Sequence, residues 1–138
     1  MTHRPAAFAA LLLSALLASA APADASGARN AAHDREMLRL DPTTRIEQRC
    51  DARAMGEVSR HHPGMKPDEL VTYAYADPEI RDQSISAPGA AVRSKGTWYH
   101  LAFRCTTSAD GLDVLSFEHR LGTAIPRSDW DGHYLVAP

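Results

Sequence analysis

The sequence has few of the features that assign a protein to a functional class on composition alone. It carries no excess of charge, since 15 Lys and Arg residues stand against 17 Asp and Glu residues and the formal net charge is −2 at pH 7. A nucleic-acid-binding domain usually has a strong basic excess, so nucleic acid is not an expected partner. Lysine is scarce, and the arginines are interleaved with acidic residues, which is typical of a mixed, solvated surface.

The sequence motifs of common enzyme classes are also absent. We find no GxSxG nucleophile turn, no HExxH zinc motif and no glycine-rich phosphate loop. An acid/base site would require strand pairing to bring His100 near His119, with Glu118 or Asp113 as the carboxylate. Because such cross-strand neighbours occur in any hairpin, the sequence favours a protein without enzymatic activity, and it predicts no cofactor.

The N-terminus does contain a recognisable export signal. His3 and Arg4 precede an uncharged apolar stretch from Ala6 to Ala18, and Ala18-Ser19-Ala20 is the small-x-small pattern that a signal peptidase accepts. We therefore predict a signal peptide over residues 1–20. The mature protein is expected to be periplasmic or secreted, with no permanent membrane span.

Two alternatives remain open at this end of the chain. A second acceptable pattern, Ala23-Asp24-Ala25, leaves both Ala21 and Ser26 as candidates for the first mature residue. The apolar run would otherwise be retained as a membrane anchor. A spanning helix needs about 20 apolar residues, and this run reaches that length only when its small residues are counted.

The chain has only two cysteines, Cys50 and Cys105. In an exported chain an even number of cysteines predicts a structural disulfide, and we expect Cys50–Cys105. Closing a loop of that length stabilises the folded state by about 4 kcal/mol in the chain-entropy description. A reactive or metal-binding pair is disfavoured, because the spacing is not CxxC and no histidine lies close by in the sequence.

The mature chain is expected to comprise a flexible leader over residues 21–33, which is small and polar, and a single domain over residues 34–138. An amphipathic helix is predicted over about residues 42–60, because apolar residues recur every four positions while charged residues occupy the other faces. Its buried stripe consists of Ile46, Cys50, Ala54 and Val58.

The start of this helix has two candidate signals. Thr44 followed three residues later by Glu47 is a capping box, whereas Asp41 followed by Pro42 places a capping side chain before a first-turn proline. His61-His62-Pro63-Gly64 ends the helix, because proline cannot continue it and glycine tolerates a reversed backbone.

Downstream of this helix the apolar period changes from about four to two. Strands are predicted over residues 70–76, 90–93, 97–107 and 112–121, and residues 77–89 form a connection that could hold a short helix or a binding loop. In the strongest of these strands, Tyr99, Leu101, Phe103 and Cys105 face one way, and Trp98, His100, Ala102 and Arg104 face the other. The sequence thus predicts an α+β fold, in which one main amphipathic helix packs on a three- to four-stranded antiparallel sheet as a two-layer sandwich with one disulfide.

A set of short strings spread over residues 38–136 resembles a known family. The strings are Leu40-Asp41-Pro42, Glu47-Gln48, Cys50-Asp51, Ala54-Met55, Gly89-Ala90-Ala91, Arg93-Ser94, Trp98-Tyr99, Phe103 with Cys105, and Ile125-Pro126-Arg127 with Trp130. They resemble bacterial domain-of-unknown-function family nine-thirty. The resemblance implies an exported envelope protein, supports the cysteine pair and the domain limits, and supplies no activity.

The predicted binding surface lies on the sheet face opposite the helix. It consists of Trp98, Arg104, Arg93 and Lys95. An exposed tryptophan among arginines has the composition of a binding hot spot, so we expect this surface to bind an envelope protein or a cell-wall component. Two alternatives stand beside it. Trp98 would instead be covered by Trp130 or Tyr134 of the C-terminal segment, and the hairpin tip at residues 93–96 would act as an inhibitor-like loop.

A second candidate function is copper or zinc binding at His61, His62 and Met65. The cluster combines imidazole and thioether ligands of the kind that suit copper in an oxidising compartment. Further ligands would have to come from elsewhere, such as His33 or His133. The competing interpretation is that two histidines at a helix C-terminus interact with the helix dipole.

Overall fold

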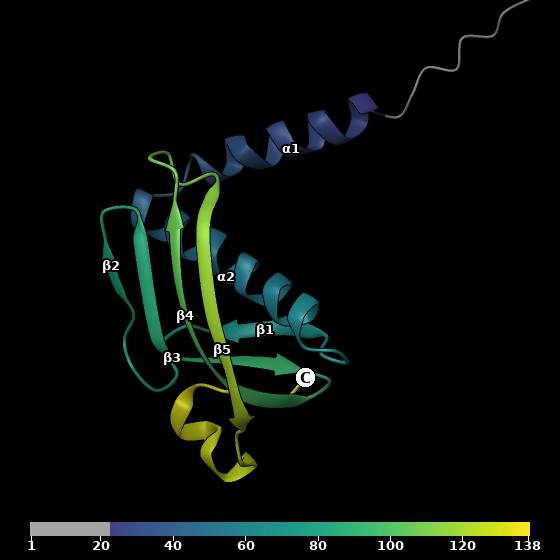
Figure 1. The fold of residues 1–138 in the computed structure, drawn as a ribbon, viewed down its shortest axis with the longest axis vertical. Coiled ribbons are helices and arrows are strands. Elements are labelled where there is room, and N and C mark those ends of the chain that lie inside the picture. Colours follow the sequence, from purple (N-terminus) through teal and green to yellow (C-terminus); the bar gives the residue numbers. More distant parts are fainter. Residues whose placement is uncertain (1–22) are drawn as a thin grey trace, which may run out of the picture.

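The structure is a computed structural model that describes residues 23–138, so the predicted signal peptide lies outside the described residues. Its elements, in chain order, are α1 (Ala23–Met37), α2 (Pro42–His61), β1 (Pro67–Val71), β2 (Glu79–Arg81), β3 (Ser84–Ser94), β4 (Thr97–Thr107), β5 (Val114–Ala124) and the 3-10 helices η1 (Arg127–Asp129) and η2 (Asp131–His133). The strands form an antiparallel sheet in the order β1-β3-β4-β5, with β2 also paired to β3, and α2 packs on one face (Figure 1). The α+β prediction is confirmed.

The main helix begins at the second of the two predicted start signals. The carboxylate of Asp41 accepts a hydrogen bond from the backbone N–H of Thr44 at 3.1 Å, and Pro42 occupies the first turn. At the other end the helix stops at His61, and the N–H of His62 donates to the carbonyl oxygen of Val58 at 3.0 Å. The sequence therefore predicted both limits of α2 to within one residue.

The face of the sheet that contacts α2, here called the inner face, carries the larger apolar core. All four residues of the predicted helix stripe are buried there. They pack against Ile85, Ala87, Ala90, Val92, Leu101, Phe103 and Cys105, and these eleven residues are the inner cluster. The disulfide Cys50–Cys105 joins α2 to the central strand β4 inside this cluster, which confirms the predicted pair.

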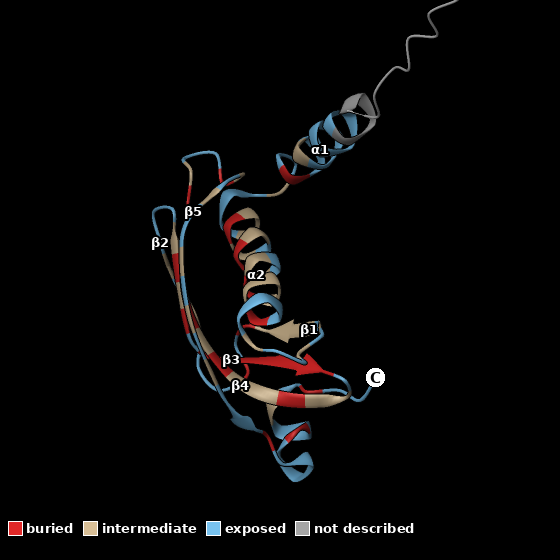
Figure 2. Ribbon diagram, turned by 45° about the vertical axis from the view of Figure 1, so that its right-hand side comes forward, coloured by how far each residue is buried: buried red, intermediate tan, exposed pale blue. Residues whose placement is uncertain are grey.

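The opposite face of the sheet, the outer face, carries a second and smaller core. This outer cluster consists of Ala74, Ala91, Trp98, Ile125, Trp130 and Leu135. Residues 125–135 fold back over one half of the outer face to form it, and the other half of that face is left uncovered. The sheet is strongly curved, with α2 in the concavity (Figure 2).

Two parts of the sheet differ from the sequence prediction. The strand expected over residues 70–76 is β1 at Pro67–Val71. The chain leaves the sheet after Val71, because the hydroxyl of Thr72 donates a hydrogen bond to the carboxylate of Asp51 in α2 at 2.9 Å and Ala74 packs in the outer cluster. The connection expected over residues 77–89 instead contains β2 and the first half of β3. The sheet therefore has five strands where three or four were expected.

The N-terminal segment also differs from the prediction. Residues 23–37 form α1, whereas a flexible leader was expected up to residue 33. Residues 27–33 are exposed and add nothing to either cluster, which agrees with the predicted lack of a core role. Asp34 near the end of α1 makes an ion pair of 2.5 Å with Arg49 of α2. No helix within residues 23–138 is long and apolar enough to cross a membrane.

A bulge in β3 determines which side chains reach each face. The pairing with β4 shifts between Ala87 and Ala90, so the inner-facing residues are odd-numbered before the bulge and even-numbered after it. Gly89 lies inside the bulge, and a Cβ atom there would be 2.3 Å from the backbone nitrogen of Ala76. This close approach, which includes a 2.8 Å hydrogen bond from the N–H of Tyr75 to the Gly89 carbonyl, holds the β1–β2 connection against the sheet.

Candidate functional site

The surface predicted around Trp98 is not exposed in the structure. Trp98 does lie on the outer face, but it is fully buried in the outer cluster, and its Nε1 donates to the carbonyl oxygen of Val136 at 2.9 Å. The alternative of a C-terminal cover is therefore the one observed. The reason is that residues 125–135 return over the outer face, where Trp130 and Leu135 pack with Trp98 in the outer cluster.

Arg93 is also withdrawn from solvent. Its guanidinium makes ion pairs with Asp68 at 2.8 Å and Glu69 at 2.7 Å, and its Cζ lies 5.5 Å from the centre of the Trp98 ring. Its side chain is only 10% exposed, so these partners occupy it fully. Arg93 thus stabilises the β1–β3 pairing and the outer cluster, and the prediction that it forms a binding surface with Trp98 is wrong.

The other two residues of the predicted surface are exposed but lie apart. Lys95 is in the two-residue turn between β3 and β4, at φ +51°, whereas Arg104 lies near the opposite end of β4. The hairpin tip at residues 93–96 presents only Lys95 and Gly96 beyond the sheet, because Ser94 is paired with Pro67 of β1. Its inhibitor-like role stays a prediction.

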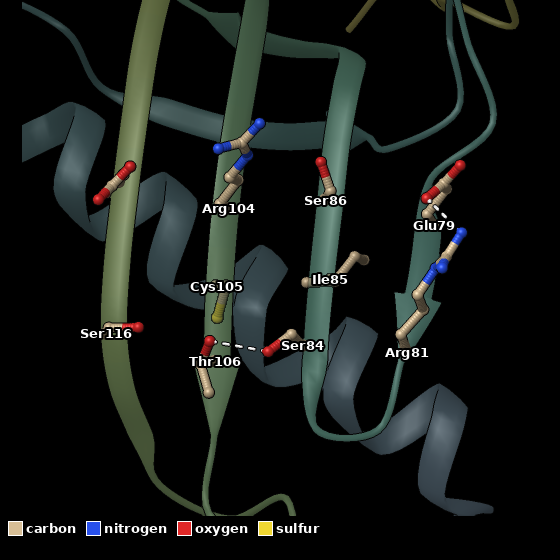
Figure 3. A pocket seen from close by; sticks show the side chains of 10 residues that line it. Glu79, Arg81, Ser84, Ile85, Ser86, Arg104, Cys105, Thr106 and Ser116 are labelled. Atoms are coloured by element: carbon tan, nitrogen blue, oxygen red, sulfur yellow. Dashed lines mark hydrogen bonds and ion pairs between the residues drawn. The ribbon is translucent and has the colours of Figure 1, made fainter.

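The uncovered half of the outer face carries a candidate site. A depression of about 350 Å³, here called the outer hollow, lies across β2, β3, β4 and β5. Its polar lining consists of Glu79, Arg81, Ser84, Ser86, Arg104, Thr106, Ser116 and Glu118. Figure 3 shows these strands with α2 behind them and the side chain of Arg104 in front.

Strand alternation explains why this surface is polar. Ile85, Cys105 and Phe117 lie side by side in register on β3, β4 and β5, and all three contact or belong to the inner cluster. Their sequence neighbours must therefore point to the outer face. Alternation along residues 97–107 predicted that Arg104 lies on that face. Ser84 and Ser86 were not predicted there, because residues 77–89 were interpreted as a connection.

The outer hollow contains two charged side chains that have no partner among the described residues and are available to bind a ligand. Arg104 lies directly opposite Glu118 in the β4–β5 register, yet among the described residues neither side chain makes a hydrogen bond or ion pair. The hydroxyls of Ser84 and Thr106 are 2.9 Å apart and bond to each other. At the rim, Arg81 and Glu79 form an exposed ion pair of 3.4 Å. The hollow therefore offers a cation, an anion and several hydroxyls at once.

Two further depressions continue the outer hollow along the sheet. One of about 370 Å³ shares Ser86, Arg104 and Glu118 with it, and another of about 430 Å³ extends to Tyr75 and His100. Together the three form a row from β2 to the edge of the outer cluster.

The far end of this row is aromatic. The Tyr75 ring stacks on His133 with centroids 3.8 Å apart, and it contacts His100 at 4.6 Å. Burial, together with the charge of Asp129, raises the pKa of the Tyr75 hydroxyl. Tyr75 therefore presents a neutral aromatic ring at this end of the row.

The acid/base pair considered from the sequence is not assembled. His100 lies on the outer face beside Tyr75, whereas His119 is paired with Phe103 and contacts His62 at the end of α2. The two histidines are thus on opposite faces of the sheet.

The histidine cluster at the C-terminal end of α2 contains different residues from the predicted set. His62 Nε2 lies 3.0 Å from Nε2 of His119, and the His61 ring is 5.9 Å from the His119 ring. Met65 packs on the inner cluster, and His33 and His133 lie on other elements. His119 was not predicted as a member of this cluster, although its position two residues from Phe117 places it on the same sheet face as Phe117.

The environment of this histidine cluster affects its protonation. Burial lowers the pKa of His119, and the neighbouring His62 and His61 lower it further, while Glu57 opposes them. Within residues 23–138 no three side chains of the His, Cys, Asp or Glu type are already arranged around a common metal position.

The match to known proteins covers most of the described fold. A family model described as Domain of Unknown Function (DUF930) matches residues 37–135, from the end of α1 to Leu135 in the outer cluster. No curated protein and no solved structure matches the chain. The matched range includes α2, all five strands and the C-terminal segment that covers Trp98, as the resemblance had indicated. The chain therefore belongs to the DUF930 family.

Proposed function

We propose that this chain is an exported, non-enzymatic periplasmic domain that binds a cell-wall component through the outer hollow. The observation that carries the proposal is the presence of unpaired Arg104 and Glu118 beside hydroxyl groups in one open depression. Such a set recognises ligands that carry hydroxyls, amides and charged groups together. A cell-wall polymer of sugars and short peptides has all of these groups.

The shape of the site supports a polymeric ligand. The three depressions follow one another across the outer face, so an extended chain would contact Arg104 near one end and the Tyr75 ring near the other. An aromatic ring offers a flat apolar surface against which a sugar ring packs. A single small molecule would fill only one depression and leave the rest of the row unused.

The composition of the hollow favours a polymer of this kind over a protein partner. Protein interfaces depend on large apolar or aromatic anchors that become buried at their centre. The exposed large apolar side chains of the described residues are Leu38, Tyr73, Tyr75, Leu115, Tyr134 and Val136. None of them lines the outer hollow.

Export is the second part of the proposal. The uncharged stretch from Ala6 to Ala18 supports it, and the disulfide Cys50–Cys105 is typical of oxidising compartments. Cell fractionation with intact-mass measurement tests it. The expected result is a periplasmic protein that begins at Ala21 or Ser26, and an uncleaved chain in the cytosol would contradict it.

Binding is tested by co-sedimentation of the mature, disulfide-intact protein with purified cell-wall sacculi. The informative variant is Arg104→Ala, because Arg104 is exposed and makes no contact that the fold needs. The matched control is Lys95→Ala, which removes one positive charge from the hairpin tip outside the hollow. We expect the wild-type protein and the control to sediment with the sacculi and the Arg104 variant to remain in solution.

The remaining outcomes are also decisive. No sedimentation of the wild-type protein, or full sedimentation of the Arg104 variant, would exclude the outer hollow as a cell-wall site. Equal loss in both variants would show general attraction of positive charge to an anionic polymer. Loss in the Lys95 variant alone would transfer the function to the hairpin tip.

A further inference from the structure

Two histidines from different elements face each other at the C-terminal end of α2. The Nε2 atoms of His62 and His119 lie 3.0 Å apart, and the rings meet edge to face with centroids 5.2 Å apart. The two residues are 57 positions apart in the sequence. Only the packing of α2 on β5 brings them together, so neither sequence spacing nor helix periodicity predicts the pair.

Both histidines are anchored through their backbones by the surrounding fold. The backbone N–H of His62 caps α2 by donating to Val58 at 3.0 Å. His119 is fixed by strand pairing opposite Phe103, and its ring contacts Phe117 with centroids 5.9 Å apart. The pair is therefore positioned before any ligand arrives, which lowers the entropic cost of binding one.

The distance between the two nitrogens fits a shared metal ion. Zn–N bonds of about 2.0–2.1 Å place two ligand nitrogens about 3.3 Å apart in a tetrahedral site, and roughly 2.9 Å apart at adjacent corners of a square-planar one. The observed 3.0 Å lies between these values. Imidazole nitrogen is a ligand that suits both zinc and copper.

We propose that His62 and His119 form a binding site for a divalent zinc or copper ion. Each ring coordinates through the lone pair of its Nε2 and keeps its single ring proton on Nδ1. The N–H···N hydrogen bond between the rings is replaced by two metal–nitrogen bonds. A tautomer change in one ring accounts for the proton, so two neutral imidazoles bind the ion without releasing any.

The rest of the coordination shell is open. His61 is the nearest further imidazole, and its Nε2 lies 3.1 Å from the carboxylate of Glu57. That carboxylate is also bonded to Arg53 and Arg60, so it is not free to act as a ligand. Since no three ligands are preset within residues 23–138, water completes the shell. This is the geometry of a site that takes up and releases metal, and it differs from a closed structural site.

The site also replaces the ligand set that the sequence suggested. Met65 was expected beside His61 and His62, but it packs on the inner cluster. A variant at Met65 therefore separates the two hypotheses. Met65→Leu keeps the apolar volume and removes the thioether, so metal binding through His62 and His119 is unaffected by it.

The test is calorimetric titration of the mature, disulfide-intact protein with zinc chloride and with copper(II) chloride. We expect one ion per chain, and for copper an electron paramagnetic resonance spectrum with coupling to two nitrogens. His62→Ala and His119→Ala each weaken binding by about a hundredfold or more, because loss of an outer partner of a ligand alone costs about 10–100-fold. His119→Gln serves beside His119→Ala, since glutamine keeps much of the side-chain volume against Phe117.

The control variants are His33→Ala, which removes an exposed histidine of α1, and Met65→Leu. Both retain binding if the proposal is right. The proposal is overturned if the wild-type protein binds neither ion, or if the His62 and His119 variants bind as tightly as the wild type. Loss of binding in the Met65 variant would restore the set predicted from the sequence. The outer hollow is lined by neither histidine, so the Arg104→Ala test of cell-wall binding and this test of metal binding can fail separately.

Discussion

The indole Nε1 of Trp98 donates a hydrogen bond to the backbone carbonyl oxygen of Val136, 2.9 Å away. This bond joins the second residue of β4 to the C-terminal segment, and the same carbonyl accepts from Arg93 at 3.2 Å. It satisfies the one polar atom of a tryptophan that is otherwise fully buried. The C-terminal segment is therefore part of the folded core and covers half of the outer face.

Alanine substitution should have very different effects on stability at two adjacent residues of this segment. Leu135 is 2% exposed in the outer cluster, so Leu135→Ala leaves a cavity beside Trp98 and should destabilise the protein by about 2–4 kcal/mol. Val136 contributes through its backbone carbonyl and its side chain is exposed, so Val136→Ala should cost less than about 0.5 kcal/mol. Urea denaturation measures both, and similar losses in the two variants would contradict this packing of the segment.

Alanine substitution at two glycines should change the free energy of unfolding in opposite directions. Gly89 has backbone atoms of the β1–β2 connection where a Cβ would lie, so Gly89→Ala should destabilise by about 3 kcal/mol or more. Gly56 lies inside α2 with no atom within 4 Å of the same position, so Gly56→Ala should stabilise by about 0.5–1 kcal/mol. Thermal unfolding compares them, and a stable Gly89 variant would mean that the connection does not lie against the bulge.

The parts of the fold that the sequence predicted depend on local periodicity. The stripe through Ile46, Cys50, Ala54 and Val58 repeats every four residues, and β4 alternates strictly, so both elements and the faces they bury follow from spacing alone. The cystine followed from the count of cysteines and the predicted export. Asp41 and Pro42 began the helix as one of two local signals indicated.

The parts that the sequence did not predict depend on contacts between distant segments. Alternation placed Trp98 on the outer face, but only the return of residues 125–135 decides that it is covered. The β2–β3 hairpin was missed because Pro88 and Gly89 resemble a loop, whereas they form a bulge inside a strand. The outer hollow needs β3, β4 and β5 in register, and the His62–His119 pair needs α2 packed on β5, so no local pattern contains either site.

The disulfide should provide a large part of the stability. Cys50 and Cys105 are both buried, and the bond closes a loop of 55 residues between α2 and β4. Replacing both residues in Cys50→Ala/Cys105→Ala should lower the free energy of unfolding by about 3–5 kcal/mol. Intact-mass spectrometry of the exported wild-type protein should show two hydrogens fewer than the reduced chain. A free-thiol mass would contradict both the bond and the proposed compartment.

A buried carboxyl group should make the stability depend on pH. Asp51 of α2 lies under the β1–β2 connection, where one oxygen accepts from Thr72 at 2.9 Å and the other has no partner. Burial raises its pKa from 3.8 to about 7, an effect that the Thr72 hydrogen bond reduces and the charge of Glu47 adds to. The folded state therefore keeps a proton that the unfolded state has already lost between about pH 4 and pH 7.

Because the folded state binds more protons in this window, the contribution of Asp51 to stability falls as pH rises from about 4 to about 7 and is constant above that. Asp51→Asn cannot ionise and keeps an oxygen to accept from Thr72, so it should remove this slope. At pH 8 it should be more stable than the wild type by roughly 2–4 kcal/mol. Asp131→Asn removes the same charge from an exposed position and is the matched control.

Urea denaturation at several pH values gives the difference in free energy of unfolding between variant and wild type. Taking this difference cancels the opposite pH dependence that comes from Asp41, Glu57 and Asp110, whose pKa values are lowered. If that difference is the same at pH 4 and pH 8, Asp51 ionises without cost and is not buried beneath the connection.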